Sequence, residues 1–100
     1  MNLIKQVVED NNQLCLHMTK ELTFKTVSDE NAKNLLKLLS EKSPSQLIIN
    51  CKDIISIDSC GLALLIYIVK SLPNTKTKLV ATSTKLEKLR TLYLSTNDHL

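Results

Sequence analysis

The sequence predicts an α/β fold in which helices pack on a mixed four-stranded β-sheet, in the order β-β-α-β-α-β-α. Two observations lead to this prediction. Short apolar or alternating segments typical of strands recur along the chain, and longer segments with helical periodicity lie between and after them. Strands that alternate with helices of this length form a sheet with crossover helices packed on it. The 100 residues fit a single domain, residues 1–100.

The chain begins with a predicted hairpin. Residues 3–9 form the first strand, and the polar residues 10–12 form a turn. Residues 13–18 alternate between two faces, one of which consists of Leu14, Leu16 and Met18. We therefore expect this segment to be a second strand paired with the first, and residues 20–27 to be a connection.

The first predicted helix starts at Ser28, a residue type that caps helices, with Asp29 and Glu30 favourably placed in its first turn. Its apolar stripe has helical spacing and consists of Ala32, Leu35, Leu36 and Leu39. The proline in Ser43-Pro44-Ser45 ends the helix, because the residue before a proline avoids helical geometry.

The second half continues with residues 46–51 as a strand, whose successive apolar residues fit a strand buried on both faces. A central helix follows over about residues 59–72, and residues 78–82 form the fourth strand. Thr84 and Glu87 have the spacing of a capping box, which predicts the start of a last helix.

The joint before the central helix carries Asp58 and Ser59, short polar residues that can accept hydrogen bonds from the free N–H groups of the first turn. Gly61 is the only glycine of the chain and lies inside that turn. A glycine within a helix costs up to about 1 kcal/mol relative to alanine. We therefore expect another backbone or a partner to approach Gly61 closely.

The central helix is apolar on both sides. A helical wheel directs one side toward the sheet, namely Leu62, Leu65, Ile66, Val69 and Leu72. The opposite side carries Cys60, Leu64, Tyr67 and Ser71, flanked by Ala63 and Ile68. An exposed apolar face beside a helix N-terminus indicates a protein partner. The alternative is that the last helix or the tail covers this face.

Composition argues against several classes of function. The net charge of +3 is mild, the lysines are scattered, and three aromatic residues offer no stacking platform for nucleic acid. No apolar run approaches the length of about 18 residues that spans a bilayer. Cys15, Cys51 and Cys60 have neither metal-site nor disulfide spacing, which indicates free thiols in a reducing, cytosolic protein without a metal or cofactor.

Catalysis has little support in the sequence. Ser59 has no nucleophile-elbow motif and no histidine base nearby in sequence, and a single glycine excludes a phosphate-binding glycine loop. Turn capping explains Asp53 and Asp58 more simply than a catalytic carboxylate pair. Ser59 can cap the helix, bind a partner or accept a phosphate, which the helix dipole would favour and Asp58 would oppose.

The segment from Leu47 to Leu65, with Ile57-Asp58-Ser59-Cys60-Gly61-Leu62 at its centre, resembles the signature of the STAS domain, the fold of bacterial anti-sigma factor antagonists. In the antagonists, the residue after the aspartate is a serine or threonine that a partner kinase phosphorylates. The resemblance therefore implies a STAS fold, with Ser59 at the phosphorylated position.

A narrower resemblance is to the STAS subunit (MlaB-like) of the Mla phospholipid-trafficking ABC transporter. Asp58-Ser59-Cys60-Gly61-Leu62-Ala63-Leu64-Leu65 is similar to its "D-T-A-G-L-A-L-L" motif, residues 85–94 are similar to its "L-x-x-L-A-x-L-Y-x-L" ending, and residues 22–27 resemble its connection after the second strand. Cys60 replaces the usual small residue.

This resemblance implies a non-enzymatic cytoplasmic subunit that binds the transporter's ATPase, and through it the permease, at the inner face of the membrane. The expected contact residues are Asp58, Ser59, Cys60, Gly61, Leu64 and Tyr67. The alternative is an anti-sigma factor antagonist whose binding to an anti-sigma factor kinase is switched by phosphorylation of Ser59. A small hydrolase using Ser59 or a cysteine is a third possibility with little support.

Overall fold

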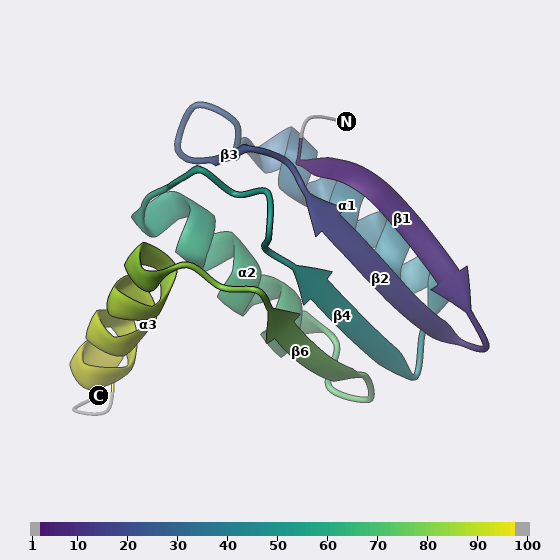
Figure 1. The fold of residues 1–100 in the computed structure, drawn as a ribbon. Coiled ribbons are helices and arrows are strands. Elements are labelled where there is room, and N and C mark those ends of the chain that lie inside the picture. The colour runs from purple at the N-terminus through teal and green to yellow at the C-terminus, as the bar shows by residue number, and fades with distance from the viewer. Residues whose placement is uncertain (1–2, 98–100) are drawn as a thin grey trace.

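A computed structural model describes residues 3–97 of the chain (Figure 1). Its elements are β1 (Ile4–Asp10), β2 (Gln13–Met18), β3 (Glu21–Leu22), α1 (Asp29–Lys42), β4 (Gln46–Asn50), β5 (Ser56–Ile57), α2 (Ser59–Ser71), β6 (Lys76–Val80) and α3 (Thr84–Asn97). The predicted order of the longer elements is confirmed. The short strands β3 and β5 are additional.

The main sheet has the strand order β1-β2-β4-β6, which confirms the predicted mixed four-stranded sheet. β1 is antiparallel to β2, whereas β2, β4 and β6 are parallel to one another. Asn11 and Asn12, in the turn between β1 and β2, both have positive φ angles of 47° and 66°. Tight hairpin turns of type I′ require this conformation, and asparagine tolerates it.

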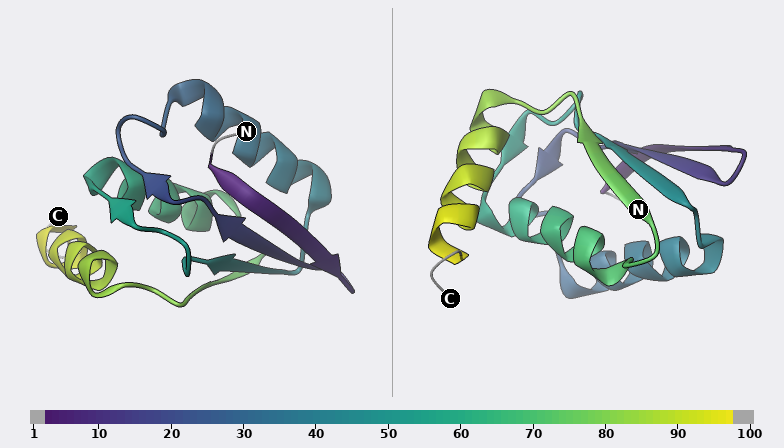
Figure 2. Two further views of the ribbon diagram at one scale, coloured as in Figure 1. Left: turned by 45° about the horizontal axis from the view of Figure 1, so that its top comes forward. Right: turned by 90° about the horizontal axis from the view of Figure 1, so that it is seen from below.

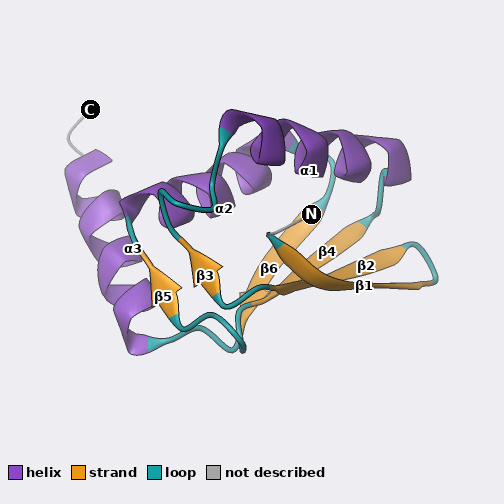
Figure 3. Ribbon diagram, turned by 90° about the horizontal axis from the view of Figure 1, so that it is seen from above, coloured by secondary structure: helices purple, strands orange, loops and turns teal. Residues whose placement is uncertain are grey.

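α1 and α2 lie on the same face of the sheet (Figures 2 and 3). The chain moves in one direction along the sheet from β2 to β4 to β6. Crossovers between parallel strands are right-handed, so two successive crossovers in the same direction put both helices on one side. The core between helices and sheet includes Leu14, Leu16, Leu35, Leu39 and Ile49, all fully buried.

The expectation that the third long strand, β4, is buried on both faces is wrong. Leu47 and Ile49 point into the core and are fully buried, but Ile48 lies on the other face and is only partly buried. None of the described helices covers that open face of the sheet (Figure 3).

β3 and β5 form a second, parallel two-stranded sheet. β3 lies within residues 20–27, which we expected to be a connection, and β5 lies between the predicted strand at 46–51 and the central helix. The N–H groups of Ile55 and Ser56 both donate to the carbonyl oxygen of Lys20, at 2.7 and 3.1 Å. This small sheet lies directly before α2 and fixes the position at which the helix starts.

Two element boundaries in the structure differ from the predicted ones. β6 begins and ends two residues before the predicted strand at 78–82. α3 is capped by Ser83, whose Oγ accepts a hydrogen bond from the N–H of Leu86 at 3.1 Å, so the predicted capping box at Thr84 is wrong. Glu87 instead forms an ion pair with Arg90.

Candidate functional site

Asp58 caps α2 and also binds a distant loop. Its Oδ1 accepts hydrogen bonds from the N–H groups of Cys60 and Gly61, at 2.9 and 3.1 Å. Its Oδ2 accepts from the N–H of Phe24, at 3.0 Å, in the loop that follows β3. Desolvation alone would raise the pKa of Asp58, but the N–H groups of Phe24, Gly61 and Cys60 hold it below its usual value.

Gly61 is buried against the backbone of β3. A Cβ atom at this position would overlap the carbonyl oxygen of Leu22 and lie 2.9 Å from its carbonyl carbon and 3.0 Å from Cγ1 of Ile57. The predicted close approach is therefore confirmed, and the neighbour is a backbone of the same chain. Gly61 therefore lies on the buried side of the first turn of α2, in contact with β3, and does not face solvent.

Ser59 is the first residue of α2 and is exposed. Its position places the hydroxyl at the positive end of the helix dipole, beside the carboxylate of Asp58. The exposed residues of α2 that follow it include Cys60, Ala63 and Tyr67, of which Tyr67 is 56% exposed. The site is accessible to a protein partner.

The expected orientation of α2 is partly wrong. Leu64 is only 4% exposed and Ile68 is fully buried, whereas Val69, assigned to the sheet side, is 40% exposed. α2 contacts α1, α3, β3 and β5. Leu64 belongs to the core, so its side chain is not available to a partner.

Phe24 also lies at the candidate site, although the sequence did not predict it there. Its side chain is 68% exposed, and its backbone is tied to Asp58 at the start of α2. A phenylalanine between the polar residues Thr23 and Lys25 is the signal that could have identified it. We define the Ser59 surface as Phe24, Ser59, Cys60, Ala63 and Tyr67.

The three cysteines lie in different environments. Cys60 is exposed, Cys15 is half-buried with its Sγ 3.7 Å from Nε2 of His17, and Cys51 is buried. Burial, with a contribution from Glu87 that Arg90 opposes, raises the pKa of Cys51 to about 11. Residues 3–97 contain no cluster of three or more histidine, cysteine or acidic side chains that could hold a metal ion.

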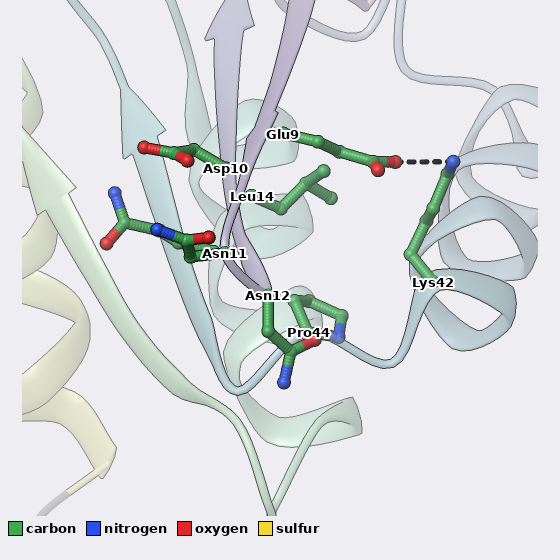
Figure 4. A pocket seen from close by; sticks show the side chains of 8 residues that line it. Glu9, Asp10, Asn11, Asn12, Leu14, Lys42 and Pro44 are labelled. Atoms are coloured by element: carbon green, nitrogen blue, oxygen red, sulfur yellow. Dashed lines mark ion pairs between the residues drawn. The ribbon is translucent and has the colours of Figure 1, made fainter.

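A hollow of about 290 Å³ lies beside the turn between β1 and β2 (Figure 4). Glu9 and Lys42 form an ion pair across it. This turn lies at the opposite end of the sheet from the start of α2 (Figure 1), so the hollow is separate from the Ser59 surface.

The mixed sheet, the two helices on one face and the capped, exposed start of α2 define a STAS-like α/β domain. The STAS domain family matches residues 4–100, and the chain belongs to this family. No curated protein matches the chain. Within residues 3–97, no helix has the length and apolar character needed to cross a membrane.

Solved structures share the fold. The anti-sigma factor antagonist SpoIIAA in its unphosphorylated form is 17% identical, with a TM-score of 0.69 over 87% of this chain and 81% of its own. The Bacillus cell fate determinant SpoIIAA in its phosphorylated form has the same identity and TM-score, over 88% of this chain and 81% of its own.

Two further proteins resemble this one. TM1081 is 26% identical, with a TM-score of 0.66 over 93% of this chain and 74% of its own. Mglu is 16% identical, with a TM-score of 0.65 over 82% of this chain. The match spans only 20% of the Mglu chain, so the present chain corresponds to one part of that protein.

Proposed function

We propose that this STAS domain is a non-enzymatic docking subunit that binds the ATPase of an Mla-type phospholipid ABC transporter through the Ser59 surface. The observation that carries the proposal is the exposure of Phe24 and Tyr67 together with Ser59, the exposed first residue of α2. Exposed aromatic side chains are typical anchors of protein interfaces.

The geometry of this surface favours docking because it is fixed in advance. Asp58 holds both the first turn of α2 and the backbone of Phe24, and Gly61 lets β3 pack against the same turn. A partner therefore has little backbone to order when it binds, which lowers the entropic cost of association.

A catalytic role for Ser59 has no structural support. His17, the one histidine in the described part of the chain, lies beside Cys15 on the open face of the sheet, away from α2. Within residues 3–97, Ser59 thus has no imidazole base, and a serine without a base is a weak nucleophile. In this proposal the protein acts in the cytoplasm, at the inner face of the membrane, through its partner.

A second candidate is an anti-sigma factor antagonist that is switched by phosphorylation of Ser59. It is favoured by the fold shared with SpoIIAA, which has been solved in phosphorylated and unphosphorylated forms. A phosphate on Ser59 would gain from the helix dipole, but it would place negative charge beside Asp58 and among Phe24, Cys60 and Tyr67. Such a modification would release an apolar partner.

The test is co-purification of the tagged protein from native cells with solubilised membranes. Wild-type protein should retain the transporter ATPase and permease, and Ser59→Asp should lose them. Thr84→Asp is the matched control, because Thr84 is the exposed first residue of α3 as Ser59 is of α2. Undiminished retention by Ser59→Asp would contradict the proposed surface.

The same purification tests the second candidate. An anti-sigma factor kinase in the eluate, together with a fraction of the protein carrying one phosphate on Ser59, would support the antagonist and overturn the transporter proposal.

A further inference from the structure

A second, positively charged surface lies outside the Ser59 surface. It is a hollow of about 390 Å³ lined by Lys5, Thr19, Lys20, Lys52, Asp53 and Ile55. These residues come from three segments: the start of β1, the residues after β2 and the loop between β4 and β5. We define the Lys20 surface as Lys5, Lys20, Lys52 and Ile55.

Backbone hydrogen bonds hold the three segments together. The N–H of Ile55 donates to the carbonyl oxygen of Lys20 at 2.7 Å, and the N–H of Thr19 donates to that of Leu3 at 3.1 Å. Within the third segment, the N–H of Lys52 donates to the side-chain Oδ1 of Asn50 at 2.9 Å, which holds the loop to the end of β4. The lysines and Ile55 therefore lie on hydrogen-bonded segments of the fold.

The surface combines unpaired positive charge with an exposed apolar side chain. Its single carboxylate, Asp53, forms an ion pair with Lys5 at 3.1 Å. Lys20 and Lys52 are exposed and form no ion pair within residues 3–97. Ile55 is 77% exposed, an unfavourable position for a β-branched aliphatic side chain unless a partner covers it.

We infer that the Lys20 surface docks on an anionic phospholipid bilayer. Lysine ammonium groups are attracted to the negative surface potential of such a bilayer, and an exposed isoleucine beside them can enter the boundary between headgroups and acyl chains. The lysines contribute about fivefold in binding each when they lie near the surface. The lining holds no aromatic residue on which a nucleic-acid base could stack.

The position of this surface lets it act together with a docked protein. β3 and β5 run in parallel, with Lys20 and Ile55 directly before them and Phe24 and Asp58 beyond their ends. The small sheet therefore separates the Lys20 surface from the Ser59 surface. The inference does not depend on which partner the Ser59 surface binds.

The experiment is co-sedimentation of the full chain with vesicles at low ionic strength, where surface charges are least screened. Vesicles of equal parts phosphatidylcholine and phosphatidylglycerol should bind the protein, and pure phosphatidylcholine vesicles should not. The double variant Lys20→Gln/Lys52→Gln should lower the partition coefficient by about tenfold or more.

The matched control is Lys33→Gln/Lys37→Gln on the exposed side of α1. Both double variants lower the formal net charge from +3 to +1, so only the position of the lysines differs. The control should change binding less than about twofold. Equal losses in the two variants would overturn the inference, because binding would then reflect net charge alone.

Ile55→Ser tests insertion. It should lower binding several-fold and leave a residual attraction that salt abolishes, whereas Leu92→Ser, at another exposed apolar position, should have no effect. Absence of vesicle binding, full binding by Ile55→Ser, or binding of a single-stranded oligonucleotide in place of vesicles would each overturn a bilayer as the partner.

Discussion

The Oδ2 atom of Asp58 accepts a hydrogen bond from the N–H of Phe24, at 3.0 Å, while its Oδ1 caps the first turn of α2. One carboxylate thus joins two segments that are 34 residues apart in the sequence. This link places an exposed phenylalanine beside Ser59 and creates the candidate interface from two separate parts of the chain.

The first prediction concerns the two functions of this carboxylate. Asp58→Ala removes the cap and the bond to Phe24, and we expect the free energy of unfolding to fall by about 2 kcal/mol. Asp58→Asn keeps one oxygen that can cap the helix, but its NH2 group cannot accept from the N–H of Phe24 and the charge is lost. Because the cap remains, its cost should be smaller than that of Asp58→Ala. Urea denaturation of the two variants measures the difference.

The control for this prediction is Ser28→Ala, which removes a cap that accepts from a single N–H group, that of Asn31 at 3.1 Å. It should cost about 1 kcal/mol. A loss in Asp58→Ala no larger than that in Ser28→Ala would show that the bond to Phe24 contributes nothing to stability.

The second prediction concerns the sign of the stability change caused by Gly61→Ala. In an open helix this change stabilises by up to about 1 kcal/mol, because alanine is the better helix former. Here the new methyl group would overlap the carbonyl oxygen of Leu22, so β3 must move or α2 must shift. We expect destabilisation of about 2 kcal/mol or more, since overpacking against backbone has no easy relief.

The comparison for Gly61→Ala is the reverse change, Ala63→Gly, at an exposed position of the same helix. It should cost about 1 kcal/mol through helix propensity alone. Thermal unfolding followed by circular dichroism measures both variants, and a higher melting temperature for Gly61→Ala would refute the packing of β3 against α2.

The sequence was sufficient to predict the order of the longer elements and the cap at Asp58, because both follow from local patterns. Alternating residues define β2, helical spacing defines α1, and a short polar residue before an apolar helix indicates a cap. The close approach at Gly61 was also predictable, since an unneeded glycine in a helix costs stability.

The orientation of α2 was not predictable in the same way. A helical wheel finds the buried side by contrast with a polar side, and α2 has apolar residues all round. The distinction between Leu64 in the core and Val69 at the surface depends on the neighbouring elements, which include the two-residue strands β3 and β5. Strands this short leave no periodic signal in the sequence. The hydrogen bond from Phe24 to Asp58 was not predictable either, because it is a tertiary contact between distant segments.

A third prediction concerns pH. The pKa of Asp58 is lower in the folded protein than its ordinary value near 4, because three N–H groups donate to the carboxylate. The stabilisation is therefore complete above about pH 4 and is lost as the pH falls through the folded pKa. Urea denaturation over this acidic range should show a drop in stability that is smaller in Asp58→Asn. Equal drops in wild type and variant would assign the acid sensitivity to other carboxylates.

The last prediction uses the cysteines to report on the Ser59 surface. An alkylating reagent at mildly alkaline pH should modify exposed Cys60 first and half-buried Cys15 more slowly. Cys51 should react only on unfolding, because it is buried and its pKa is raised to about 11. Mass spectrometry of the alkylated peptides gives the three rates separately. A bound ATPase subunit should then slow the reaction of Cys60 without changing that of Cys15, which lies on the far face of the sheet. Equal protection of both thiols, or none at Cys60, would place the partner away from the Ser59 surface.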